Sequence, residues 1–70
     1  MREETMLREY TEPECEFFRA RCNFTADERE VFDLRVKDVS IVAISLKMSV
    51  SESTVNRLIK RVKKKIHRVL

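Results

Sequence analysis

The chain has 70 residues, with no glycine and a single proline. Tight β-hairpin turns need residues that accept positive φ, and glycine is the usual one, so this composition argues against a β-rich fold. A chain of this length forms one domain with a modest core. Apolar residues make up 43% and charged residues 39% of the sequence, which is typical of a small helical domain.

Histidine and cysteine are also scarce, with only His67, Cys15 and Cys22. These are too few for a zinc site, and His67 has no carboxylate or cysteine nearby in the sequence for acid–base or nucleophilic chemistry. On one helix the two cysteines would lie about 10 Å apart, too far for a disulfide. We therefore expect buried, reduced thiols, with a redox or metal role as the alternative. The sequence predicts no catalytic site, no metal and no cofactor.

The sequence lacks a membrane-spanning run as well. Its longest apolar-rich stretch, VSIVAISLKMSV, is interrupted by serines and by Lys47. A transmembrane helix needs roughly 18 apolar residues in succession, and no signal-peptide pattern opens the chain. We expect no membrane association and a cytoplasmic location.

Charge is distributed unevenly along the chain. Residues 1–30 hold nine acids and five bases, a net charge of −4, whereas residues 31–70 hold ten bases and three acids, a net charge of +7. The last fourteen residues contain seven bases and no acid. A cationic end of this kind suggests a nucleic acid or an anionic surface as the partner.

Residues 1–23 form an acidic segment that we predict to be helical. Residues 2–10 have the pattern of a short helix, or equally of a frayed end. Pro13 suits the first turn of a helix that opens near Glu14. Phe17 and Phe18 would then face the core, and Arg19 would point outward. The segment is either a cover for the core or a protein-binding arm.

Residues 24–70 carry clearer signals for helix boundaries. Thr25 followed by Glu28 is a capping box, and Phe24 before it suits a hydrophobic staple. Asp38 suits a left-handed turn after this helix. The predicted buried stripe consists of Val31, Phe32 and Leu34.

Ser40 is the next candidate N-cap, in front of the apolar residues IVAISLK. A buried strand is the competing interpretation, because β-branched residues are frequent there. We favour a helix, since no partner strand is evident elsewhere, and we expect it to be the most buried helix.

Four serines occur within residues 45–53, and we interpret them as a turn that ends in a helix cap at Ser51. The last helix then covers residues 52–69, about 27 Å at 1.5 Å per residue. Apolar residues recur in it at helical spacing: Val55, Leu58, Ile59, Val62, Ile66 and Val69.

A short buried helix, a tight turn and a longer basic helix make the helix-turn-helix pattern. The run FTADEREVFDLRVKDVSIVAISLKMSVSESTV, residues 24–55, resembles the DNA-binding domain of the LuxR/NarL/GerE regulators, and TVNRLIKRVKKKI is similar to region 4 of bacterial sigma factors. Three positions depart from the LuxR-type pattern. Asp38 stands for its usual glycine, Ala43 for its glutamate and Ser45 for its alanine.

The resemblance implies that bases are read just after the TV pair, by Asn56, Arg57 and Lys60. For these side chains the simpler alternative is a solvated helix face. The phosphate contacts that it implies are Lys47, Ser51, Ser53, Thr54, Arg61, Lys63 and Lys64.

Together these features predict one compact all-α domain, a small bundle of four or five helices with a long C-terminal recognition helix. It divides into an acidic segment, residues 1–23, and a helix-turn-helix part, residues 24–70. The predicted function is that of a bacterial, nucleoid-associated transcriptional regulator that binds double-stranded DNA sequence-specifically, as a homodimer. The alternatives are a stand-alone sigma region 4-like module whose main partner is RNA polymerase, and a membrane-surface binder, which leaves the capped turn unexplained.

Overall fold

The computed structural model describes residues 10–70. Over this range the chain forms four α-helices and no strand: α1 (Glu12–Arg21), α2 (Ala26–Val36), α3 (Ile41–Met48) and α4 (Glu52–Val69). The predicted all-α bundle with a long last helix is confirmed, and α4 has the predicted bounds. The helix predicted at residues 2–10 lies outside the described residues, apart from Tyr10.

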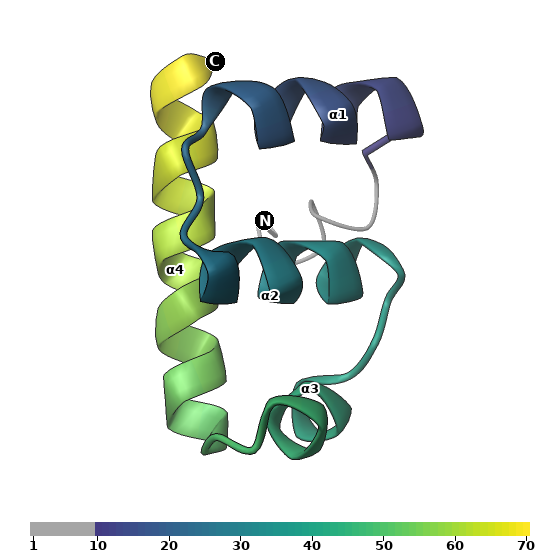
Figure 1. Ribbon diagram of the computed structural model, residues 1–70, viewed down its shortest axis with the longest axis vertical. Coiled ribbons are helices and arrows are strands. Elements are labelled where there is room, and N and C mark those ends of the chain that lie inside the picture. Colours follow the sequence, from purple (N-terminus) through teal and green to yellow (C-terminus); the bar gives the residue numbers. More distant parts are fainter. Residues whose placement is uncertain (1–9) are drawn as a thin grey trace.

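The three shorter helices pack against α4, which is the spine of the molecule (Figure 1). In Figure 1, α3 lies beside the N-terminal end of α4, α2 crosses its middle and α1 lies near its C-terminal end. No helix within residues 10–70 is long and apolar enough to cross a membrane.

Each helix begins at a hydroxyl side chain that accepts a hydrogen bond from the backbone N–H three residues later. The caps are Thr11, Thr25, Ser40 and Ser51. Those at Thr25, Ser40 and Ser51 confirm the predicted starts. At Thr11 the cap is a complete box with Glu14, so α1 begins at Glu12, earlier than predicted.

The turns use left-handed backbone without glycine. Asn23, Asp38 and Ser49 have φ values of 54°, 65° and 58°. Asparagine and aspartate tolerate this region because their short polar side chains bond locally. The turn predicted at Asp38 is therefore confirmed.

The core consists of two clusters that share α4. One joins α1 and α2 to the C-terminal half of α4: Cys15, Phe18, Cys22, Phe32, Val62 and Ile66. The other joins α2 and α3 to its N-terminal half: Val31, Ile44, Val55 and Leu58. Ile59 packs against both clusters, so a single helix connects the two halves of the molecule.

Two predictions of burial are wrong. Helix α3 is not the most buried helix, because Val42 is 52% and Leu46 is 75% exposed. Phe17 is 42% exposed, since α1 faces the core with the stripe of Cys15, Phe18 and Cys22. Its ring instead lies under the Arg21 guanidinium, at 5.1 Å from the centroid.

Side-chain interactions that the sequence pattern did not predict connect α1 to α2. Arg19, expected to point outward, donates to Asp33 at 2.8 Å and lies 3.6 Å from Glu12. Phe24, expected to form a hydrophobic staple within the first turn or two of α2, packs in a tilted arrangement on Phe32 at the second turn, at 5.2 Å between centroids. Both contacts hold the short α1–α2 connection against the core.

Candidate nucleic-acid interface

Three residues connect α3 to α4, and each has a local reason for its conformation. Ser49 ends α3 in the left-handed region, and the N–H of Val50 then donates to the Ser45 carbonyl at 3.0 Å. The Ser51 hydroxyl accepts the N–H of Thr54 and donates to Thr54 Oγ1, both at 3.1 Å. This tight, doubly capped connection between two helices is the helix-turn-helix arrangement.

Helix α4 is strongly two-sided. Val55, Leu58, Val62 and Ile66 are buried along one side. Arg57, Lys60, Arg61 and Lys64 recur on the other side at spacings of three and four residues, and all four are exposed. None of the four forms a hydrogen bond or an ion pair with another residue of the described range. The exposed face of α4 is therefore a row of cations without hydrogen-bond or ion-pair partners in the described range.

The predicted base-reading residues lie together near the start of this face. Asn56, Arg57 and Lys60 are all exposed on the first half of α4. Of the predicted phosphate contacts, Thr54 and Lys63 are half-buried, whereas the others are exposed: Lys47, Ser51, Ser53, Arg61 and Lys64. The structure places all of them on α4, at its N-cap Ser51 or at the end of α3. Their roles in DNA binding stay predictions.

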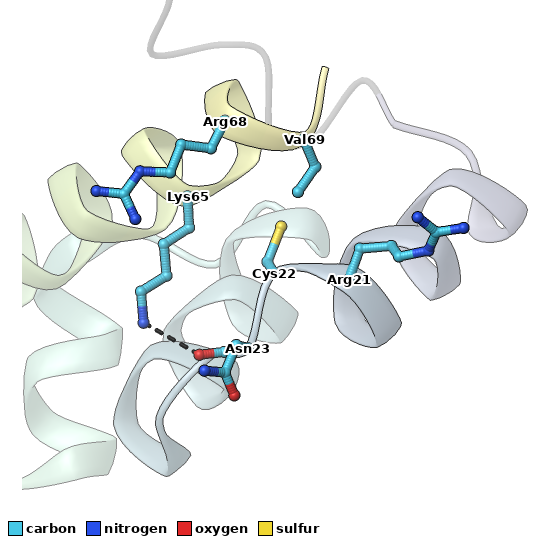
Figure 2. Close-up of a pocket in the computed structure, with 6 residues that line it drawn as sticks. All are labelled: Arg21, Cys22, Asn23, Lys65, Arg68 and Val69. Carbon is cyan, nitrogen blue, oxygen red and sulfur yellow. Dashed lines mark hydrogen bonds between the residues drawn. The ribbon is translucent and has the colours of Figure 1, made fainter.

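The most buried charge of the described chain, Glu28, pairs with a lysine of the basic run. Lys65 Nζ donates to Glu28 Oε1 at 2.6 Å. It also donates to the Asn23 carbonyl at 3.1 Å, as Figure 2 shows. Glu28 is 2% exposed and also accepts the N–H of Thr25. Lys65 therefore joins α4 to the α1–α2 turn. Local pattern could not find this pair, because 37 residues separate its members.

Burial alone would raise the pKa of the Glu28 carboxyl. The hydrogen bonds from Lys65 and from the Thr25 N–H outweigh that effect and hold the pKa below its usual range. Glu28 is thus ionised at neutral pH, and its charge is compensated within the fold.

The two cysteines are free and buried, as predicted. Burial raises the pKa of both thiols, and Lys65 opposes this only in part for Cys22. Protonated thiols are poor nucleophiles and poor metal ligands. Over residues 10–70, no three histidine, cysteine or acidic side chains are grouped closely enough to hold a metal ion.

Residues 25–66 match the family described as sigma-70, region 4. The chain belongs to this family. The match begins at Thr25, the cap of α2, and extends over α3 and most of α4, which is more than half of the chain. Neither the curated proteins nor the solved structures contain a significant match.

Membership of the sigma-70 region 4 family confirms the sigma-type resemblance, whereas the LuxR-type resemblance stays a hypothesis. The family consists of non-catalytic helix-turn-helix domains with a DNA-binding role related to transcription, and this describes the chain at that level. Helix α1 lies outside the matched residues.

Proposed function

We propose that the α3–turn–α4 unit reads a specific sequence of duplex DNA and that the protein thereby regulates transcription. The observation that carries this proposal is the row of exposed, unpaired cations on α4 in a domain of the sigma-70 region 4 family. The proposal includes a bacterial source and a location at the nucleoid in the cytoplasm.

The major groove, about 12 Å wide, accepts an α-helix whose first turns reach base edges. The Arg57 guanidinium suits guanine, since it can donate to O6 and N7 together, and the Asn56 amide suits adenine. Lys60, one turn further along α4, lies beside them on the exposed face. We assign base contacts to these three residues.

Phosphates on either side of the groove would be held by two kinds of group. Lys47, Arg61, Lys63 and Lys64 supply charge, and the hydroxyls of Ser51, Ser53 and Thr54 supply hydrogen bonds at the positive end of the helix dipole. Such contacts position the protein without reading sequence. One short helix contacts few bases, so the proposal includes a homodimer on two half-sites about one helical turn apart.

Selection from a pool of random duplexes, at several salt concentrations, tests this function. We expect a recovered consensus with two half-sites. Arg57→Ala should then weaken binding by about 1–3 kcal/mol and relax specificity at one base position. Lys64→Ala, the control on the same face, should weaken every sequence alike and lower the salt slope by about one. Salt-sensitive binding without any consensus would refute a sequence-specific reader.

A second candidate function is that of a stand-alone module held mainly by RNA polymerase. The family match favours it, and so do the large apolar side chains that the fold leaves exposed, Val42 and Leu46 on α3. Purified bacterial RNA polymerase and the duplex recovered by the selection, compared by biolayer interferometry, separate the two candidates. Tight binding to the polymerase together with weak DNA binding would favour the module, and the reverse pattern would favour the independent regulator.

A further inference from the structure

The cations on the exposed face of α4 continue beyond the residues to which DNA contacts were assigned. Arg68 follows Lys64 by four residues, about one helical turn, and is likewise exposed. It makes no hydrogen bond or ion pair within the described range. In Figure 2 its guanidinium points away from Cys22 and from Arg21. Arg68 therefore extends the row that begins at Arg57 to the last turn of α4.

The rest of the fold leaves this side of α4 open along its whole length. In Figure 1, α1, α2 and α3 all extend from α4 toward the same side, and the opposite side of α4 is uncovered. The apolar stripe of α4 faces the three helices, so the cations are on the uncovered side. The 18 residues of α4 make a rod of about 27 Å. A straight edge of this length can lie along a groove without the shorter helices entering it.

The charges of α1 fit the same arrangement. Glu12 and Glu14 are in its first turn, and Arg21 is in its last turn. Figure 1 shows that the last turn of α1 lies beside α4, whereas the first turn is at the far end of α1. Helix α1 thus places a cation, and not its first-turn acids, near the C-terminal end of α4.

The backbone at this end of α4 does not favour an anion by itself. The C-terminal end of a helix carries a partial negative charge, so a phosphate is held there only by cationic side chains. The same charge gives Arg68 an alternative role, because a cation in the last turn stabilises the helix. A phosphate contact contributes to the salt dependence of DNA binding, whereas a purely stabilising arginine does not.

We infer that α4 lies along the major groove over its full length and that Arg68 contacts a backbone phosphate beyond the bases read by Arg57. This inference rests on the proposed function, because it describes how the same helix lies on the same duplex. Eleven positions separate Arg57 from Arg68, about 16 Å of helix. At about 3.4 Å per base pair, that distance corresponds to about five base pairs. Entry by the first turns alone would leave Arg68 in solvent.

Salt titrations of binding to a random-sequence duplex test the contact. Arg68→Gln should lower the slope of log affinity against log salt by about one and weaken every sequence alike. Arg29→Gln is the matched control, because Arg29 is an exposed arginine of α2 outside the row. It should leave the slope unchanged. A normal slope in Arg68→Gln, with or without a loss of thermal stability, overturns the inference.

A scan of methylphosphonate linkages, each of which removes the charge of one phosphate, locates the contact on the duplex recovered by the selection. In the unaltered chain we expect a loss of affinity at a phosphate about five base pairs from the base pair that Arg57 reads. The same linkage should cause no further loss in Arg68→Gln, because the two changes remove one interaction. Losses that add at every phosphate overturn the inference.

The failure of this contact and the failure of the proposed function give different results. If the selection recovers no consensus but Arg68→Gln still lowers the slope, sequence-specific reading fails and the full-length contact of α4 stands. If a consensus is recovered and the slope of Arg68→Gln is normal, the proposed function stands and α4 enters the groove by its first turns only. That second result overturns the inference.

Discussion

At the residue scale, Glu28 connects two helices through a contact between residues 37 positions apart in the sequence. Its carboxylate completes the capping box of α2 and holds Lys65 of α4, while 2% of the residue is exposed. Removing one member of a buried charged pair leaves the other charge uncompensated, which is more costly than losing an exposed pair. Glu28 should therefore contribute to stability well beyond an ordinary helix cap.

The lowered pKa of Glu28 makes this contribution depend on pH. Because the folded pKa lies below the unfolded one, the stabilisation is present above the unfolded value, about 4.3, and is lost as the pH falls through the folded value. Glu28→Gln should therefore lower the free energy of unfolding by about 2 kcal/mol at pH 7. The difference from the unaltered chain should shrink toward zero in acid.

Urea unfolding between pH 2 and pH 7 measures that difference. Glu30→Gln is the control, since Glu30 is an exposed carboxylate on the same helix and should change stability little at any pH. A Glu28→Gln penalty that stays constant from pH 7 into acid would show that the carboxylate charge is not the source of the stabilisation.

At this scale, an interaction could be predicted from the sequence when its two residues lie close together in the chain, and not when they lie far apart. Ser51 was predicted as a cap because its partner, the N–H of Thr54, is three residues away. The exposure of Arg57 followed from helical spacing alone. In contrast, the pairing of Lys65 with Glu28 and of Arg19 with Asp33 depends on how helices pack, which local pattern does not fix.

At the scale of the elements, the starts of α2, α3 and α4 could be predicted because caps are local chemistry. The start of α1 differs from the predicted one because Pro13 does not open the helix but occupies the first turn of a helix capped by Thr11. The burial of α3 was overestimated for another reason. The apolar run in α3 indicates that this helix packs against a core, but an eight-residue helix beside α4 buries only one of its faces.

The turn between α3 and α4 gives a test at the same scale. Ser49 has a left-handed backbone, which costs a residue with a Cβ atom about 1–2 kcal/mol. Ser49→Gly removes that strain, and the greater freedom of glycine in the unfolded chain offsets only part of the gain. We expect the free energy of unfolding to rise by about 0.5–1 kcal/mol.

Ser53→Gly is the matched control for the turn, because Ser53 lies in the first turn of α4. There the same substitution should lower stability by about 0.5 kcal/mol. Thermal unfolding of both variants checks the opposite signs. Equal losses in the two variants would mean that the turn is not strained at Ser49.

At the scale of the whole molecule, α4 takes part in both core clusters through its buried face and carries cations on its exposed face. Residues 1–30, which carry a net negative charge, and the basic C-terminal run meet near the end of α4, where Lys65 contacts Glu28. The division of the chain at residue 23 stays a prediction. Cys15, Phe18 and Cys22 of α1, all within that first segment, share a core cluster with Val62 and Ile66.

Because α4 passes through both clusters, we expect the described helices to unfold together. Val55 and Val62 are fully buried in different clusters. Val55→Ala and Val62→Ala should each cost about 2 kcal/mol, and Val42→Ala, at a half-exposed position, less than about 0.5 kcal/mol. NMR signals from Phe18 in one cluster and Ile44 in the other should disappear at the same urea concentration in every variant. Separate midpoints would show that α1 and its cluster unfold on their own. They would also show that α4 does not couple the stability of that cluster to the stability of the cluster around α3.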